Sequence, residues 1–155
     1  MSSSPVEFSI PQPKADPFRD RRPPYSEEAE QAVLSAMLLD ADAVSRASEL
    51  VDETMFYREP HRRIFKAMIT LHRDNAAVDP LTLSDELDRT GSLVVVGGKD
   101  YLATLIDIVP TTANVEHHCK IVREKALRRR LIEVATGIVT EAYEGQHSSH
   151  DLMDL

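Results

Sequence analysis

The sequence predicts an all-α protein: a bundle of about five or six short helices followed by one long helix. Apolar residues recur at helical spacing in segment after segment. The only strand-like run, Leu93 to Val96, has no partner run elsewhere, which argues against a sheet. The stretch from about Ala113 to Glu144 contains no proline, which favours one long final helix.

The ordered part is predicted to begin near Ser26. Residues 1–24 hold six of the nine prolines and few apolar side chains, which indicates a disordered tail. Ser26 is a favourable N-cap, and the acidic residues after it suit the positive end of a helix dipole. Apolar residues then follow the helical period from Ala29 to Met37. A second short helix fits Asp42 to about Leu50.

Proline and glycine mark the ends of the next helices. Pro60 fits the first turn of a helix that Asp74-Asn75 ends, and Asp79-Pro80 starts another that Gly91 closes. Leu93 to Val96 is interpreted as a buried connector. Gly97-Gly98 then precedes a helix from about Asp100 to Ile108, which ends before Pro110.

The long helix carries two apolar stripes, more than one neighbouring element would cover. Such a wide face favours a protein partner, although packing on the chain's own bundle explains the pattern equally well. The candidate interface residues on the two stripes are Leu127, Leu131, Ile132, Val134, Ile138, Val139 and Tyr143.

Charge argues against a main nucleic-acid binder, because the net charge is −8 and a surface that binds phosphates should be basic. Residues 120–130 are an exception, with six basic residues against one acidic residue. Arg128, Arg129 and Arg130 are candidates for weak contacts with phosphate or an acidic partner. A solvated helix face is the alternative interpretation.

No residue pattern indicates catalysis or a metal. Gly97-Gly98-Lys99 lacks the preceding glycine and the following Ser or Thr of a phosphate loop, so we expect it to shape the start of a helix. The histidines form no ligand set, His61 is expected to hydrogen-bond locally, and most of the acidic residues are expected on exposed faces. Cys119, the only cysteine, excludes an internal disulfide and fits the reducing cytosol. No run of apolar residues is long enough to span a membrane, and no secretory signal is recognisable.

Five blocks in series resemble the N-terminal domain of DnaB-family replicative helicases. They are Pro24 to Leu34; Phe56-Tyr57 with His61-Arg62 and Ile64-Phe65; Asp79 with Thr82-Leu83 and Leu87; Gly97-Gly98 with Tyr101-Leu102 and Leu105; and Pro110-Thr111 with Ala113-Asn114, Ile121 to Ala126 and Arg129 to Ile132. Among the departures, Ser35 stands where the family usually has glycine, Met55 replaces an acidic residue, and His118-Cys119 replace a Tyr-Ala pair.

The resemblance implies an orthogonal helical bundle over 25–112, after a tail over 1–24. Residues 113–155 would form a long helix and a truncated helical hairpin, whose turn would lie at Gly145 to His147 and whose second arm would begin near Ser148. Family domains associate into a collar on a hexamer and contact primase and a loader. The ATP- and Mg²⁺-dependent motor, which unwinds DNA 5′ to 3′ and makes most of the DNA contacts, would lie beyond Leu155. We therefore expect no catalytic, cofactor or metal site in this chain, and a cytoplasmic location.

A self-standing helical adaptor of the replication machinery is the second hypothesis, and a small enzyme that uses the acidic residues is the third. A reading frame that continues past codon 155 into a phosphate loop would favour the helicase. A nucleotide or metal effect on the purified chain would favour the enzyme.

Overall fold

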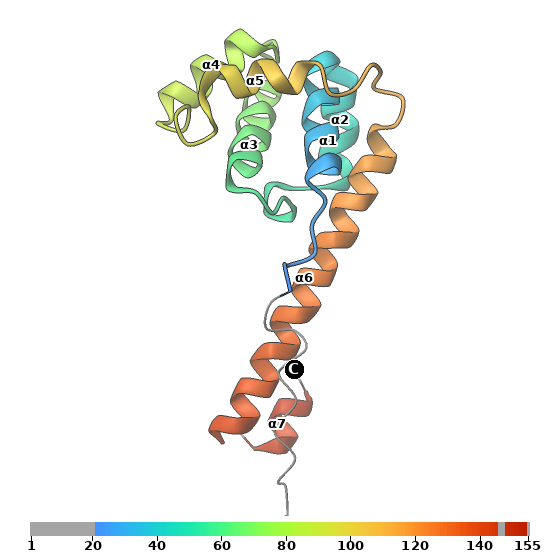
Figure 1. Cartoon of the computed structure of the whole chain (residues 1–155), viewed down its shortest axis with the longest axis vertical. Coiled ribbons are helices and arrows are strands. Elements are labelled where there is room, and N and C mark those ends of the chain that lie inside the picture. Colours follow the sequence, from blue (N-terminus) through green and yellow to red (C-terminus); the bar gives the residue numbers. More distant parts are fainter. Residues whose placement is uncertain (1–20, 146–147, 155) are drawn as a thin grey trace, which may run out of the picture.

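The computed structural model describes residues 21–145 and 148–154, and all their regular structure is helical. The bundle consists of α1 (Glu27–Leu39), α2 (Ala41–Leu50), a 3-10 turn η1 (Glu53–Met55), α3 (Glu59–Arg73), α4 (Pro80–Arg89) and α5 (Gly98–Ile106). The long helix α6 (Val115–Glu144) and the short α7 (Ser149–Met153) follow. Figure 1 shows α5 lying crosswise over the end of the bundle and α6 leaving it at the opposite end. The predicted all-α class is confirmed.

Local chemistry sets the helix boundaries. The Ser26 hydroxyl caps α1 by accepting a hydrogen bond from the Ala29 N–H at 3.1 Å. Asp79 and Thr82 form a reciprocal capping box at the start of α4, and Pro80 occupies its first turn. Gly91 follows α4 in the left-handed conformation, with φ +74°. The starts predicted near Ser26, Pro60 and Pro80 are therefore confirmed.

The core lies between α1, α2 and α3, and α4, α5 and the first turns of α6 complete it. Its largest fully buried apolar side chains include Phe56, Leu34, Met37, Ile64 and Met68. α6 contributes Val115, Cys119 and Val122, spaced by four and three residues on one face. The start of the long helix is thus part of the bundle.

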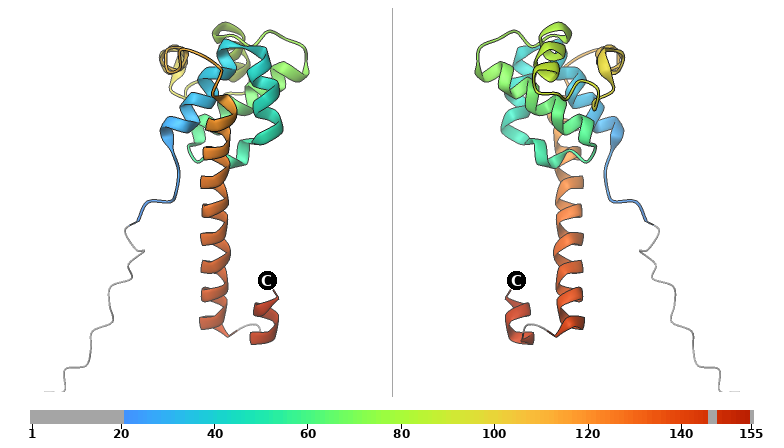
Figure 2. Two further views of the ribbon diagram at one scale, coloured as in Figure 1. Left: turned by 90° about the vertical axis from the view of Figure 1, so that its right-hand side faces the viewer. Right: turned by 90° about the vertical axis from the view of Figure 1, so that its left-hand side faces the viewer.

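The rest of α6 projects away from the bundle as a single straight helix (Figure 2). α7 lies beside the far end of α6, and Leu152 is its buried residue. Ser148 caps α7 by accepting from the Asp151 N–H at 3.2 Å, which confirms the predicted start of a second arm. Most of the predicted tail, two residues of the predicted hairpin turn, Gln146 and His147, and Leu155 lie outside the described residues.

Two predictions about α5 and the connection before it were wrong in detail. Residues 93–96 form turns in which Val96 is buried but Val94 is 89% exposed, so this connector is not a buried run. The helix predicted from Asp100 to Ile108 runs from Gly98 to Ile106: Gly97, at φ +101°, is its N-cap, and Gly98, at φ +72°, is its first residue. A Cβ on Gly97 would lie 2.9 Å from Tyr101 Cβ, which requires glycine there.

Candidate partner-binding surface

The apolar side chains of α6 beyond Val122 form a surface that nothing in the described chain buries. Leu131 is 69% exposed and Tyr143 is 88% exposed, and Ile138 is the one candidate that is half-buried. The exposed members come from both predicted stripes: Leu127, Leu131, Ile132, Val134, Val139 and Tyr143. We call these six residues the α6 surface. The sequence left open whether one stripe packs on the bundle, and in the structure neither does.

Such a surface has one ready explanation in physical terms. Large apolar side chains gathered on an exposed helix face are unfavourable in water and usually mark a site of association. The charged residues between them, among them Arg128 and Glu133, keep the helix hydrated. The α6 surface is therefore suited to contact with a helical partner.

A mixed-charge groove of about 1010 Å³ lies where α6 leaves the bundle, between α6, η1 and α3. Basic and acidic side chains both line it, and several are paired: Arg62 and Arg63 with Glu59, and Arg130 with Glu133. Because the pairs are largely exposed, each adds little to stability.

A buried polar network holds the bundle together beside this groove. Glu30 of α1 and His61 of α3 are both fully buried, and their carboxylate oxygen and Nδ1 lie 2.8 Å apart. The carboxylate also accepts the backbone N–H of Tyr57 at 2.8 Å and of Arg58 at 3.3 Å. His61 Nε2 lies 2.6 Å from the Tyr101 hydroxyl, which also accepts from Gln31 at 3.3 Å. Three helices and one loop are thus joined through polar atoms that all have partners.

The prediction for His61 was wrong, because its ring hydrogen-bonds across helices rather than locally. Glu30 lies in the core and is an exception to the exposed faces expected for most acidic residues. The sequence did contain a sign that Glu30 is buried. Apolar Ala29 directly precedes it, and apolar residues follow it on the same side of the helix. The hydroxyl of Tyr101, on α5, joins the network as well.

The three consecutive arginines of α6 have different environments. Arg128 pairs with Glu124 and Arg130 with Glu133, and both are well exposed. Arg129 instead donates to the carbonyl oxygens of Pro24 and Met55, each at 2.7 Å. Burial lowers the pKa of the Arg129 guanidinium, and the carboxylate of Glu30 acts in the opposite direction.

Two amino groups of Arg129 therefore donate to the chain's own carbonyl oxygens, whereas Arg128 and Arg130 pair with acidic residues of α6. The contact of these three arginines with phosphate or an acidic partner stays a prediction.

Departures from the family pattern also have local explanations. The Ser35 hydroxyl accepts a hydrogen bond from the Val109 N–H at 3.2 Å, which ties α1 to the loop before α6. Cys119 is buried against the core, and this burial raises the pKa of its thiol to about 12.

Other kinds of site find little support in residues 21–145 and 148–154. Within these ranges no three His, Cys, Asp or Glu residues are grouped so that they could hold a metal ion. No helix of the described chain has the length and hydropathy needed to cross a bilayer.

The chain thus combines a helical bundle with a long projecting helix that exposes apolar side chains, an architecture typical of interaction domains. The comparisons name its family: residues 22–124 match the DnaB-like helicase N-terminal domain, and the chain belongs to that family. It is 45% identical to the replicative DNA helicase DnaB of Rhodothermus marinus over 86% of this chain. With the replicative DNA helicase DnaC of Bacillus subtilis it shares 43% identity over 89% of this chain.

Solved structures agree with the family and with the fold. The crystal structure of the N-terminal domain of DnaB helicase from Mycobacterium tuberculosis matches with a TM-score of 0.82 and 40% identity, over 86% of this chain and 94% of that one. A DnaB-like replicative helicase, whose structure was described with its interactions with primase, matches with a TM-score of 0.64 and 29% identity, over 76% of this chain and 28% of that one. The chain spans 14% of the length of the Rhodothermus marinus relative and 30% of the Bacillus subtilis relative.

Proposed function

We propose that this chain is the assembly and partner-binding domain of a replicative DNA helicase in the bacterial cytoplasm. Its copies associate through the α6 surface into the collar of a hexamer, and primase and a helicase loader bind the assembled domains. ATP- and Mg²⁺-dependent unwinding of DNA, 5′ to 3′, belongs to a motor domain outside this chain. The observation that carries the proposal is the α6 surface, six apolar side chains that the described chain leaves exposed.

Two arguments support association rather than chemistry. An exposed apolar helix face gains stability when a second helix covers it. A relative at 29% identity is described with its interactions with primase, which makes primase the first partner to test. Weak DNA binding fits the same proposal, since a net charge of −8 opposes phosphate.

The test replaces apolar residues of each stripe by glutamine, a good helix former. One variant is L127Q/L131Q and the other is I132Q/V139Q. Self-association is measured by sedimentation and primase binding by titration. We expect at least one pair to weaken one of these affinities by about tenfold or more, because covered apolar side chains of this size contribute roughly 1.5–3 kcal/mol each.

Leu81 provides the matched control. It is 67% exposed on α4, away from α6, and L81Q makes the same change at nearly the exposure of Leu131. Both affinities should be unchanged in L81Q, and all three variants should keep the helical circular dichroism spectrum. If neither α6 pair weakens either affinity, the α6 surface is not the interface and the proposal fails.

A further inference from the structure

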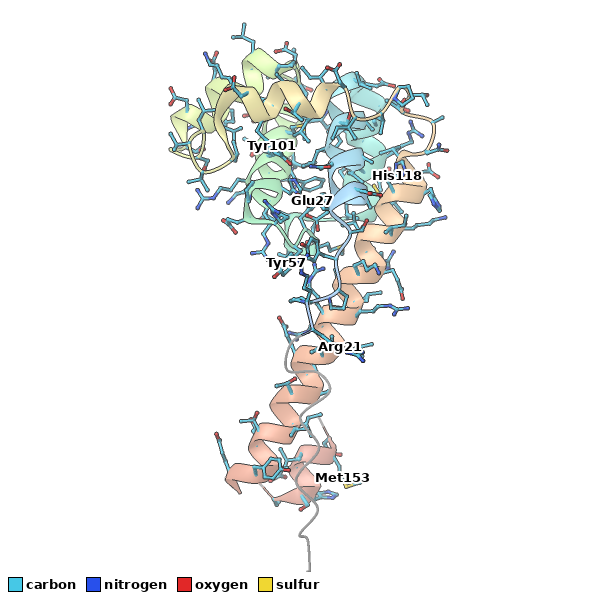
Figure 3. All side chains as sticks on the ribbon, in the orientation of Figure 1. Arg21, Glu27, Tyr57, Tyr101, His118 and Met153 are labelled. Carbon is cyan, nitrogen blue, oxygen red and sulfur yellow. The ribbon has the colours of Figure 1, made fainter. Side chains whose placement is uncertain are left out.

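Three segments distant in the sequence meet where α6 leaves the bundle. They are the residues before α1, the connection from η1 to α3, and the middle of α6. Tyr25 and Tyr57 stack with their ring centroids 4.4 Å apart, which joins the first two segments. Figure 3 shows Tyr57 at the lower edge of the bundle, close to α6.

Arg129 joins the third segment to the other two. One amino group of its guanidinium donates to Pro24 and the other to Met55, both at 2.7 Å. The same guanidinium lies over the ring of Tyr57, 5.4 Å from its centroid. A planar guanidinium is suited to such a site, because its donors point in fixed, divergent directions while its face packs on a ring.

The loop from Met55 to Tyr57, which Arg129 contacts, is itself hydrogen-bonded to the core. The buried carboxylate of Glu30 accepts the backbone N–H groups of Tyr57 and Arg58. Arg62 donates to the carbonyl oxygens of Phe56 and Tyr57, at 2.7 and 3.3 Å. The partners of Arg129 are therefore fixed to α1 and α3 and cannot simply move with α6.

Arg129 lies at a position on α6 where its contacts can control the direction of the projecting part of the helix. Val122 is the last buried residue of α6, and Arg129 follows it by about two turns on the same side of the helix. From Val122 to the end of the helix at Glu144 the axis runs roughly 33 Å. A tilt of ~20° about Val122 would move that end by about 11 Å, far more than an interface tolerates.

We infer that Arg129 is the positioning residue that fixes the direction of the projecting half of α6 relative to the bundle. It does so by bridging Pro24 and Met55 and by packing on Tyr57. Under the proposed function, on which this consequence rests, the same contact sets the angle at which the α6 surface meets a partner. The positioning itself is a property of the single chain and can be measured without any partner.

The test measures a distance in the whole chain by pulsed electron resonance. Spin labels are attached at D88C on α4 and T140C on α6, both exposed positions. Cys119 can stay, because it is buried and its thiol pKa is about 12. Labelled chain is diluted into unlabelled chain so that only distances within one molecule are recorded. The unchanged background should give one narrow distribution, and R129A should give a broader one, because a tilt of ~20° about Val122 moves residue 140 by roughly 9 Å.

The neighbouring arginines provide controls that change the same charge on the same helix. R128A and R130A should leave the distribution narrow, because both side chains are exposed and pair only with acidic residues of α6. R129K keeps the charge but has a single ammonium group, which cannot bridge two carbonyl oxygens as the guanidinium does, so it should broaden the distribution as well. R129K replaces R129A in the test if R129A does not fold. The inference is overturned if R129K and R129A stay as narrow as R128A, or if R128A broadens as much as R129A.

The assembly proposal is judged separately, by the sedimentation of the glutamine variants. A broadened R129A distribution combined with normal association would leave the positioning role standing and would place the interface elsewhere.

Discussion

At the scale of single residues, the Glu30 carboxylate is a buried group with three polar partners in the bundle. It is 2% exposed and faces His61 Nδ1 and the backbone N–H groups of Tyr57 and Arg58. The contacts continue on the other side of the imidazole ring, where His61 Nε2 lies 2.6 Å from the Tyr101 hydroxyl. Such a network orders helices because each donor and acceptor requires the others to stay in place.

We predict that E30Q lowers the free energy of unfolding by about 1–3 kcal/mol, the usual cost of leaving a buried hydrogen-bonding group without its partner. The amide nitrogen of glutamine would face at least one of the donors that now point at the carboxylate. Urea denaturation measures the change. E28Q is the matched control on the exposed side of α1 and should stay within about 0.5 kcal/mol. Equal effects of the two substitutions would contradict the assigned role of the network.

Cys119 gives a prediction that depends on pH. Burial is the main cause that raises its thiol pKa to about 12, and Glu116 adds to it. At about pH 8 the folded chain should react negligibly with a thiol reagent, whereas the chain in urea, with a free thiol pKa near 8.5, should react quickly. A raised pKa in the folded state contributes stability that is fully present below the unfolded value and is lost as pH rises toward 12.

A C119A variant should therefore lose less stability than the parent between about pH 8.5 and the folded value, the window set by the two pKa values. Rapid labelling of the native chain at neutral pH would show that the thiol is accessible and would contradict the packing described for α6.

At the scale of elements, the starts of several helices could be predicted from N-capping residues and from proline in the first turn. Ser26, Pro60 and the Asp79-Pro80 pair each mark the start of a helix because their chemistry acts within one turn. The turns at 93–98 could not be predicted, because two adjacent glycines with positive φ shift a helix start without any periodic signal. The network and the Arg129 bridge were missed for another reason: their partners are up to 105 residues apart in the sequence.

A substitution at Gly137 tests whether α6 is a continuous, regular helix. It lies in the interior of the exposed half of α6, and a Cβ there would meet nothing within 4 Å. Because glycine costs roughly 0.5–1 kcal/mol relative to alanine inside a helix, G137A should raise the stability of α6 by about that amount. Hydrogen exchange of the amides from 130 to 144 should slow accordingly. Unchanged or faster exchange would mean that glycine serves a bend or a contact in this helix.

At the scale of the whole molecule, two opposing features decide how copies of the chain meet. The net charge of −8 makes the molecules repel one another, while the α6 surface favours association. The sequence alone showed both features but could not show that they are separated in space. The structure places the α6 surface on a projecting helix, away from most of the bundle, so that the apolar faces of two copies can approach while their bundles stay apart (Figure 2).

Self-association should therefore strengthen when salt is added. Raising the salt concentration from about 0.1 M to about 1 M shortens the screening length from ~10 Å to ~3 Å, which removes the repulsion between acidic bundles. The contact of apolar side chains across the α6 surface is not weakened by the same change. Sedimentation of the chain at several concentrations in both buffers measures the association constant, and I132Q/V139Q in the same buffers shows how much of it depends on α6. If added salt weakens association instead, ion pairs between copies, formed by charged residues such as Arg128 and Glu133, hold the interface together. The apolar side chains between these charges would then not drive association.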